Sequence, residues 1–312
     1  MSTSGPSFAL VGSGAVASAL APRWCERGAR LVGLASRDRA GAARLATSCG
    51  ALDVEVREHA RELALGCELL LLAVPDAQIV PVAQELAQSG ASAALFAHAS
   101  GAVPSAALAP LATGGAALAA IHPLLALPPG RTAAIDWANA HFGLEGDARA
   151  VELARGWVER LGARSFAVRP DAKALYHAAA VLASNDLVAL LAEAQRCLHV
   201  AAPEAPPSAL LSLAESALRA LRERDGAAVQ ALSGPLVRGD LGTVREHLAA
   251  FDRLALDGGE AERLREVYVA LLRAALPLAE LARGEAERRD GALRELEQEL
   301  ARSRSRGGEP RA

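Results

Sequence analysis

Short apolar runs alternate with longer amphipathic segments along the first half of the chain. The apolar runs are rich in Val, Leu and Ala and occupy residues 8–11, 31–35, 69–73, 95–98, 118–121, 141–144 and 165–168. Strands of a parallel sheet that is covered on both faces have such continuous apolar sequences, and the helices between them supply the cover. We therefore predict an α/β domain with a doubly wound, mostly parallel sheet over residues 1–168.

The strand pattern stops after residue 168, and helical periodicity continues. Pro, Gly and Ser break this periodicity at residues 203–207, 233–235 and 257–259. The helices expected between the breaks are residues 170–199, 207–222, 226–232, 243–250 and 260–283. We predict an all-α C-terminal domain over residues 169–285.

The last segment, residues 286–312, is densely charged and ends in a stretch rich in Arg, Ser and Gly. Such a composition predicts a solvated, charged helix that frays into a disordered tail. An interaction tail is the alternative.

Composition narrows the class of ligand. The chain has 312 residues, 52% of them hydrophobic and 22% charged, with a formal net charge of −3. A nucleic-acid binder or a protein of anionic membrane surfaces usually has a basic excess, so a small-molecule ligand is favoured over either. We expect no membrane-spanning helix and no secretory signal.

The cysteines are scattered. Cys25, Cys49, Cys67 and Cys197 form no C-x-x-C pair and have no His at metal-binding spacing, which predicts neither a metal site nor a disulfide framework. Reduced thiols fit a cytoplasmic protein.

The first predicted strand runs directly into a glycine-rich turn, Gly12-Ser-Gly-Ala-Val-Ala17, which precedes an apolar helix. This is the G-x-G-x-x-A fingerprint of a Rossmann-type dinucleotide site in its strand, turn and helix context. The helix N-terminus offers backbone N–H groups and a positive dipole end to the pyrophosphate. The alternative is a tight turn without a ligand. Cofactor contacts are expected from Gly12, Ser13, Gly14, Ala15 and Val16.

The residues after the second strand bear on the choice between NAD and NADP. NAD-binding proteins usually have an acidic residue there, about 20 residues after the fingerprint, which holds the ribose 2′-OH. Here the strand is followed directly by Ser36 and Arg37. A hydroxyl and a guanidinium group can bind a 2′-phosphate, which favours NADP. Asp38 could serve NAD instead, and Arg37 could be an ordinary solvated charge.

The third predicted strand leads into Val74-Pro75-Asp76, at the carboxyl edge where open α/β sheets bind ligands. Val74 and Pro75 are expected to shape the wall beside the cofactor. Asp76 could contact a ligand or cap the following helix.

Several motifs together resemble a bacterial family that joins a Rossmann-like domain to a helical domain of unknown function. They are Gly12-Ser-Gly-Ala-Val-Ala17, Ala73-Val-Pro-Asp76, His98-Ala-Ser-Gly101, Ile121-His-Pro123, Lys173-Ala-Leu-Tyr-His-Ala-Ala-Ala-Val-Leu-Ala-Ser-Asn185 and Ser233-Gly-Pro-Leu-Val-Arg-Gly-Asp240. The family is similar to pyrroline-5-carboxylate reductases, ketopantoate reductases, β-hydroxyacid dehydrogenases and prephenate dehydrogenases. The resemblance implies an NAD(P)-dependent oxidoreductase.

Two candidate catalytic residues follow later strands: Ser100 follows the strand predicted at residues 95–98, and His122 follows the strand predicted at residues 118–121. Both are therefore expected at the same carboxyl edge of the sheet as the cofactor. Prephenate dehydrogenases have a similar Ser and His-Pro. That resemblance implies that Ser100 binds substrate and that His122 acts as an acid or base, for which a near-neutral pKa is suitable. His98 could also face the ligand in this cleft. Alternatively, His98 and His122 cap strand ends by hydrogen bonding to loop carbonyls.

The first helix of the second domain has a polar face. At about 100° per residue, Lys173, His177 and Ser184 lie within roughly 40° of one another, and Asn185 borders the same groove. β-Hydroxyacid dehydrogenases and ketopantoate reductases have a Lys and an Asn on the corresponding helix. The resemblance implies that Lys173 donates a proton and that Asn185 orients substrate. Because His177 shares the face of Lys173, we also expect it to contact the substrate. These side chains could instead have structural roles in the helix.

The break at residues 233–240 contains both charge signs. Arg238 could contact Asp240 in a structural turn, or it could pair with a substrate carboxylate.

We therefore expect an NADP-dependent oxidoreductase that transfers a hydride between nicotinamide and a small carbonyl, imine or hydroxy substrate in a cleft between the two domains. It is expected to form a homodimer through the helical domain. The alternatives are a catalytically inactive NAD(P)-binding sensor or interaction protein, and a partner-dependent scaffold acting through the charged C-terminal segment.

Overall fold

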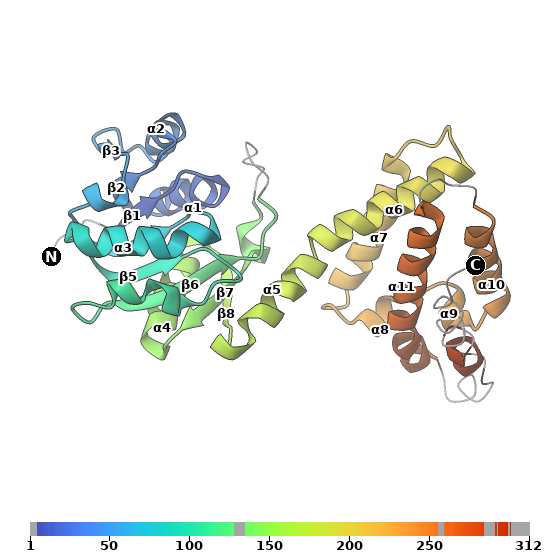
Figure 1. Ribbon diagram of the computed structural model, residues 1–312. Coiled ribbons are helices and arrows are strands. Elements are labelled where there is room, and N and C mark those ends of the chain that lie inside the picture. The colour runs from blue at the N-terminus through green and yellow to red at the C-terminus, as the bar shows by residue number, and fades with distance from the viewer. Residues whose placement is uncertain are drawn as a thin grey trace, which may run out of the picture. The chain divides into compact units, whose positions relative to one another are not determined.

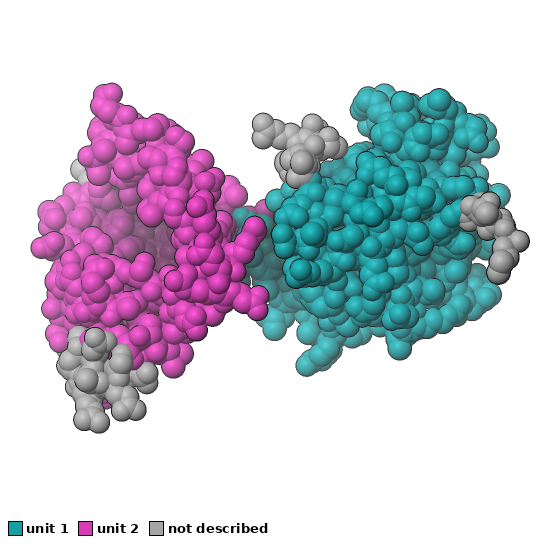
Figure 2. All heavy atoms as spheres, turned by 180° about the vertical axis from the view of Figure 1, so that it is seen from behind, with its two compact units in different colours: residues 1–184 teal, residues 185–312 magenta. Residues whose placement is uncertain are grey.

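The computed structural model describes residues 5–127, 135–254 and 259–283, together with 291, 293–298 and 300. The chain divides into two compact units, residues 1–184 and residues 185–312 (Figure 2). The first unit contains the sheet and the second is helical.

One eight-stranded sheet forms the centre of the first unit (Figure 1). Its strands are β1 (Ser7–Val11), β2 (Arg30–Ala35), β3 (Val56–Arg57), β4 (Gly66–Leu72), β5 (Ser92–His98), β6 (Ala117–Pro123), β7 (His141–Gly146) and β8 (Arg164–Ala167). Their order is β3-β2-β1-β4-β5-β6-β7-β8, and only the β6–β7 pair is antiparallel. The predicted fold class is confirmed, and all seven predicted strands are present. The sequence did not predict the two-residue strand β3.

Each face of the sheet has its own apolar core. On one face lie α1 (Ala15–Glu26), α2 (Arg39–Ser48) and α4 (Ala148–Leu161). On the other lie α3 (Ile79–Ser89) and the short 3-10 helices η1 (Ala60–Glu62) and η3 (Ser105–Leu111). Alternate residues of each central strand serve opposite faces: Leu69 and Leu71 of β4 belong to the first core, and Leu70 and Leu72 to the second.

Three large aromatic side chains anchor the first core. The rings of Phe8, Trp24 and Trp157 make edge-to-face contacts with one another at centroid distances of 5.2–6.0 Å. The indole N–H of Trp24 donates to the carbonyl oxygen of Trp157 at 2.9 Å, which satisfies its one polar atom inside the core.

The strand order reverses between β1 and β4, because β2 and β3 lie to one side of β1 and the later strands lie beyond β4. The connections that leave β1 and β4 therefore run in opposite directions and leave a crevice at the carboxyl ends of these strands. The residues that follow them, Gly12 after β1 and Val74 after β4, border this crevice. The fold thus makes a ligand site where the glycine-rich turn lies.

The helix predicted over residues 170–199 is divided in the structure. It consists of η5 (Pro170–Ala172), α5 (Lys173–Leu182) and α6 (Asn185–Ala201), with a break at residues 183 and 184. At the break the Ser184 hydroxyl donates to the carbonyl oxygen of Ala180, a side-chain bond that favours helix bending. The first compact unit extends to Ser184 rather than to the predicted boundary at 168, because side chains of α5 pack into the sheet domain.

The second unit contains α6, α7 (Ser208–Arg222), α8 (Ala228–Ala231), α9 (Pro235–Arg238), α10 (Leu241–Asp252) and α11 (Glu260–Ala282). Its apolar core is formed by α9, α10 and α11 with Leu293, Leu296 and Leu300. These three leucines are at most 5% exposed, whereas Arg294, Glu295 and Glu297 are exposed, so the described part of the predicted charged helix has one face in the core and one in solvent. The sequence has Leu there at spacings of three and four, which gives the segment an apolar face that packs into the core. The predicted disordered tail at residues 301–312 lies outside the described residues.

The motif at residues 233–240 connects helices. Gly239 ends α9 with φ +69, a conformation that favours glycine. The Asp240 carboxylate caps α10 by accepting from both the backbone N–H and the hydroxyl of Thr243, at 3.1 and 2.7 Å. These bonds, rather than an ion pair with Arg238, account for most of the lowered pKa of Asp240. The motif therefore serves as a helix connection.

Several apolar side chains on α5, α6 and α7 face solvent. Leu175, Leu182, Val188 and Leu213 are each more than 60% exposed. Both α6 and α7 lie wholly in the described part of the chain, and neither has a buried residue. Among the described residues, the stretch 170–201 has the length and mean hydropathy, 1.4, of a helix that could cross a membrane. The core helix of a soluble protein can have the same length and composition.

Candidate functional site

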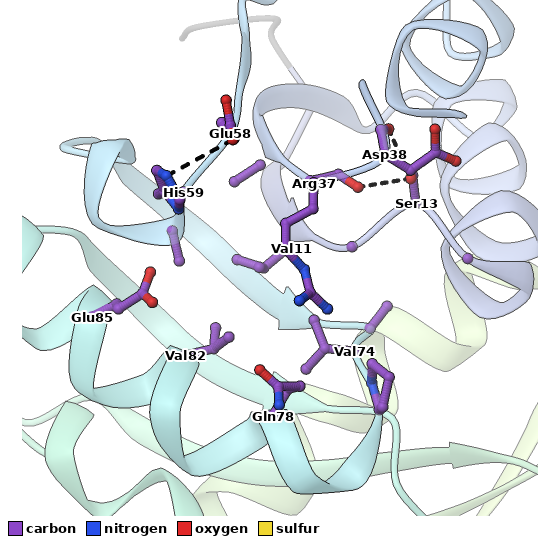
Figure 3. Close-up of a pocket in the computed structure, with 17 residues that line it drawn as sticks. Val11, Ser13, Arg37, Asp38, Glu58, His59, Val74, Gln78, Val82 and Glu85 are labelled. Atoms are coloured by element: carbon purple, nitrogen blue, oxygen red, sulfur yellow. Dashed lines mark hydrogen bonds and ion pairs between the residues drawn. The ribbon is translucent and has the colours of Figure 1, made fainter. Parts of the chain in front are cut away.

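A pocket of about 810 Å³ opens at the crevice between β1 and β4 (Figure 3). Of the residues predicted to bind cofactor, Gly12, Ser13, Gly14, Ser36, Arg37, Val74 and Pro75 all line it. Ala15 and Val16 form the start of α1, directly after Gly14. The structure therefore gathers around one pocket residues that are separated by more than 60 positions in the chain.

The two glycines of the turn have different reasons to be glycine. Gly12 has φ +103, and a Cβ built there would lie 2.2 Å from the carbonyl oxygen of Ala73, so the fold itself requires glycine. A Cβ on Gly14 would meet no described atom within 4 Å beyond its chain neighbours, and its φ of −73° suits any residue. Protein packing does not explain Gly14, whereas close approach of a ligand to the backbone does.

The first turn of α1 offers anion-binding groups. Gly14 is its N-cap and has no side chain to bond the exposed backbone N–H groups, and the first turn contains no acidic residue. Uncapped N–H groups and the positive end of the helix dipole together favour a phosphate. The local sequence thus prepares this turn for a pyrophosphate.

Two hydroxyl groups and a guanidinium group line the pocket beside the glycine-rich turn. The Ser13 and Ser36 hydroxyl oxygens are 2.9 Å apart, and the Arg37 side chain extends across the pocket toward Val74 (Figure 3). The Asp38 carboxylate instead caps α2 by accepting from the Gly41 N–H at 2.9 Å. Asp38 also lines the pocket, and the helix cap occupies one of its two carboxylate oxygens, Oδ1.

Sequence reasoning missed part of the lining. Glu58 and His59 lie between β3 and η1, and Ala60 begins η1, whereas Gln78 ends η2 (Asp76–Gln78) and Val82 and Glu85 belong to α3. β3 has only two residues, too few for a strand pattern, and helix periodicity does not tell which face borders a ligand. Only the tertiary structure identifies these residues.

Besides the pocket, a polar cluster lies at the carboxyl edge of the same unit, around His122 on β6. It consists of His98, Ser100, His122, Lys173, Tyr176 and His177. The imidazole Nδ1 of His122 is 2.7 Å from the phenol oxygen of Tyr176 on α5. The strand residue opposite His122 is Gly143, and a Cβ there would lie 2.3 Å from that phenol oxygen. Glycine at this position therefore admits the Tyr176 ring that holds His122.

His177, the next residue on α5, faces the same imidazole. The ring centroids of His122 and His177 are 6.1 Å apart, and a Cβ on Gly101 would lie within 2.8 Å of both rings. The Nδ1 atom of His177 is buried and has no hydrogen-bond partner among the described residues. A buried ring nitrogen without a partner is uncommon and is a candidate for a contact with a ligand.

Lys173 forms a buried ion pair beside these rings. Its ammonium is 3.3 Å from the Glu145 carboxylate, and both side chains are 4% exposed. The same carboxylate accepts from the backbone N–H and the hydroxyl of Ser105, at 2.7 and 2.8 Å. Lys173 is therefore fixed by the protein rather than free in solvent.

Ser100 and His98 shape the turn after β5. The Ser100 hydroxyl accepts from the N–H groups of Ala102 and Val103, which leaves its proton available to donate. The fully buried His98 accepts at Nδ1 from the Ser100 N–H, so its Nε2–H donates to the carbonyl oxygen of Pro104. Of the two roles left open for His98, the structure matches the capping one.

Burial dominates the protonation of the cluster. It lowers the pKa values of His98 and His122 to about 4, so both rings are neutral at pH 7. Burial also lowers the pKa of Lys173, an effect that the neighbouring Glu145 opposes, and raises the pKa of Tyr176 to about 12. The near-neutral pKa expected for His122 is therefore wrong, because sequence alone does not give its burial.

Asp76 connects the cluster with the pocket. It follows Pro75 of the pocket lining, and its negative charge acts on His98, His122 and Lys173 by raising their pKa values. The polar cluster and the pocket therefore border the same edge of the sheet. Asn185, the remaining predicted site residue, is exposed and belongs to the second compact unit, so the first unit does not bring it to this edge.

Comparisons with known proteins agree with this architecture. The profile of a Rossmann-like domain matches residues 4–123, and the profile of a domain of unknown function, DUF2520, matches residues 140–275. No curated protein matches the sequence.

Solved structures share the fold. A protein of Thermotoga maritima is 26% identical with a TM-score of 0.67, over 88% of this chain and 98% of the other. A protein of Bacteroides fragilis, provisionally assigned as an NADP oxidoreductase, is 21% identical with a TM-score of 0.65, over 86% and 97%. A pyrroline-5-carboxylate reductase of Coxiella burnetii is 18% identical with a TM-score of 0.55, over 89% and 99%.

These matches extend over nearly the whole length of each solved protein, and the two profiles follow one another along the chain as the motifs indicated. The chain thus combines a Rossmann-like domain with a domain of the DUF2520 family.

Proposed function

We propose that the protein is an NADP-dependent oxidoreductase that transfers a hydride between nicotinamide and a small carbonyl, imine or hydroxy substrate. The observation that carries this proposal is Gly14. It borders the pocket at the reversal of strand order, its backbone does not need glycine, and it precedes an uncapped helix N-terminus. A pyrophosphate close to this backbone explains all three features. The reductases that share the fold support the same class of reaction.

The preference for NADP rests on Ser13, Ser36 and Arg37, which line the pocket. The guanidinium of Arg37 and the paired hydroxyls of Ser13 and Ser36 can bind a 2′-phosphate, while the Asp38 carboxylate caps α2. Glu58 and Glu85 also line the pocket, and they would disfavour a phosphate placed against them. We therefore expect the 2′-phosphate on the side of Ser36 and Arg37.

A bound nicotinamide cofactor would supply or accept the hydride. His122 is neutral at pH 7, and when Tyr176 donates to its Nδ1, its Nε2 carries a proton. A neutral imidazole of this kind polarises a substrate oxygen or nitrogen by donating a hydrogen bond. Ser100 and His177 are suited to bind the substrate, and Lys173 to hold α5 against the sheet.

Nucleotide titration tests cofactor binding. We expect NADPH to bind to the wild type more tightly than NADH. Gly14→Ala should weaken NADPH binding at least tenfold while the protein stays folded, because the added methyl occupies ligand space. Gly156→Ala is the matched control, since this exposed helix position also has no described neighbour within 4 Å of a Cβ. Equal NADPH binding by the wild type and both variants would sink the proposed site.

Removing the positive charge of Arg37 tests cofactor choice. Arg37→Ala should weaken NADPH binding and leave NADH binding unchanged. Arg39→Ala is the control, because Arg39 lies two residues away at the start of α2 and faces Glu58 at 4.0 Å instead of lining the pocket. Parallel losses for both nucleotides in Arg37→Ala would argue against a 2′-phosphate contact.

Turnover separates an enzyme from a cofactor-binding sensor. We would screen carbonyl, imine and hydroxy compounds for NADPH oxidation or NADP reduction, and compare the wild type with His122→Asn and Tyr176→Phe. Loss of kcat with unchanged NADPH affinity in both variants is the expected result. Tight nucleotide binding without turnover of any compound would favour the sensor.

The helical domain is proposed to form a homodimer in the cytoplasm. Its support is the exposed apolar side of α6 and α7, with Val188 at 68% and Leu213 at 67% exposure. A second copy would remove these side chains from water, and size-exclusion chromatography with light scattering tests this. A monomeric mass for the wild type would contradict it.

A further inference from the structure

One side of the cofactor pocket is lined by side chains that the phosphate contacts described above do not use. The pyrophosphate would lie at the glycine-rich turn and the 2′-phosphate beside Arg37, whereas the lining residues of η2 and α3 remain without a role: Gln78, Val82 and Glu85. In Figure 3, Arg37 lies between Ser13 on one side and Val82 and Glu85 on the other. The pocket therefore extends past Arg37 to the face of α3.

This part of the pocket has the lining that the base of a nucleotide needs. The base and the 2′-phosphate of a dinucleotide are attached to neighbouring carbons of one ribose, so a phosphate bound by Arg37 leaves the base close to that side chain. Ala60 at the start of η1 and Val82 on α3 line the pocket there with apolar groups, which suit the flat faces of an aromatic ring. The guanidinium of Arg37 can also stack on such a ring.

Glu85 supplies a polar group to the same part of the pocket. It lies three residues after Val82, so both side chains are on one face of α3. The Glu85 side chain is partly buried, and it makes no hydrogen bond or ion pair with any described residue. Glu58, which also lines the pocket, is instead 4.0 Å from both the Arg39 guanidinium and the His59 imidazole. Of these two glutamates, Glu85 is therefore the one left to bind a ligand.

We propose that Glu85 selects the adenine base by accepting a hydrogen bond from its exocyclic amino group, while Val82 packs against the ring. This inference rests on the proposed binding of a nicotinamide dinucleotide in the pocket. A carboxylate only accepts hydrogen bonds, and adenine has an amino donor at the position where hypoxanthine has a carbonyl oxygen. The same carboxylate therefore favours an adenine dinucleotide and disfavours the hypoxanthine analogue, whose oxygen would face it without a hydrogen bond.

The test measures the affinity of the full chain for NADPH and for its reduced hypoxanthine analogue. We expect the wild type to bind NADPH at least about tenfold more tightly than the analogue. Glu85→Gln should bring the two affinities to within about threefold of each other, because an amide can donate to a carbonyl oxygen as well as accept from an amino group. The same pair of titrations with NADH and its hypoxanthine analogue makes the result independent of the 2′-phosphate.

Glu159→Gln is the matched control. It removes an exposed carboxylate from α4, which lies on the other face of the sheet, so the affinity ratio should stay that of the wild type. Glu58→Gln is a second comparison, because it removes the other glutamate of the lining. Binding of either NADPH or its analogue by each variant also shows that the variant is folded.

The outcomes separate this inference from the proposed function. Tight NADPH binding with equal affinity for the analogue in the wild type, or an unchanged ratio in Glu85→Gln, would overturn the role of Glu85 and leave the cofactor site intact. A ratio that changes in Glu58→Gln but not in Glu85→Gln would assign the base contact to Glu58 and overturn it as well. No binding of any of the four nucleotides to the wild type would refute the cofactor site itself, and the role of Glu85 with it.

Discussion

Removing the Lys173 ammonium tests how the sheet domain holds α5. In the protein this group lies 3.3 Å from the Glu145 carboxylate, and both side chains are almost fully buried. Lys173→Met keeps the length and most of the volume of the side chain but removes its charge. Glu145 then keeps only the two hydrogen bonds from Ser105.

The size of the effect follows from burial. Taking away one partner of a buried ion pair leaves an uncompensated charge and typically costs about 3–5 kcal/mol. We expect Lys173→Met to fall at the low end of that range, because the Ser105 hydrogen bonds partly stabilise the remaining carboxylate. Glu145→Gln added to Lys173→Met removes the charge, so the double variant should recover about 2 kcal/mol.

Urea unfolding followed by tryptophan fluorescence is the assay. All three tryptophans, Trp24, Trp137 and Trp157, belong to the first compact unit, so the signal reports the sheet domain. With a slope of about 2 kcal/mol per molar urea, the midpoint of Lys173→Met should fall by about 1.5 M. A loss below about 1 kcal/mol, or strictly additive effects in the double variant, would refute the argument that burial makes this pair cooperative.

Three further predictions concern the same unit. The first concerns pH. The pKa values of His98 and His122 are about 4 in the native protein and 6.5 in the unfolded chain, so between these pH values the unfolded state binds more protons. The free energy of unfolding therefore falls as the pH decreases from 6.5 to 4. For the fully buried His98 the loss amounts to about 3 kcal/mol, and a urea midpoint that stays constant from pH 7 to pH 4 would contradict it. Gly143→Ala should displace the Tyr176 ring and reduce kcat more than it reduces NADPH affinity, whereas equal effects on both would disagree with a local role. Gly12→Ala should destabilise the domain by more than about 2 kcal/mol, because the new Cβ meets a backbone carbonyl at 2.2 Å and φ is +103; an unchanged melting temperature would show that the turn can relax.

The sequence by itself determined the architecture and much of the cofactor pocket. Residues 69–72 are completely buried because both faces of the sheet are covered, and a strand of this kind has a continuous apolar sequence that can be recognised without the structure. The turn Gly12-Ser-Gly14 predicted the pocket because a tight turn and a close backbone approach each restrict the residue type. Ser36 and Arg37 were found for the same reason, since the fold fixes where the second strand ends.

The tertiary structure decided the protonation and partners of the polar groups. His122 was identified from its place after a strand, but its lowered pKa depends on burial and on neighbours from α5, which no local pattern contains. Tyr176 was overlooked because its role depends on Gly143, a strand residue 33 positions earlier that leaves space for its ring. Glu145 was overlooked because it lies inside an apolar strand, where only the approach of Lys173 and Ser105 explains a buried carboxylate. Local sequence limits what one element can be, whereas the charge state and hydrogen-bond partners of a buried side chain depend on every element that packs against it.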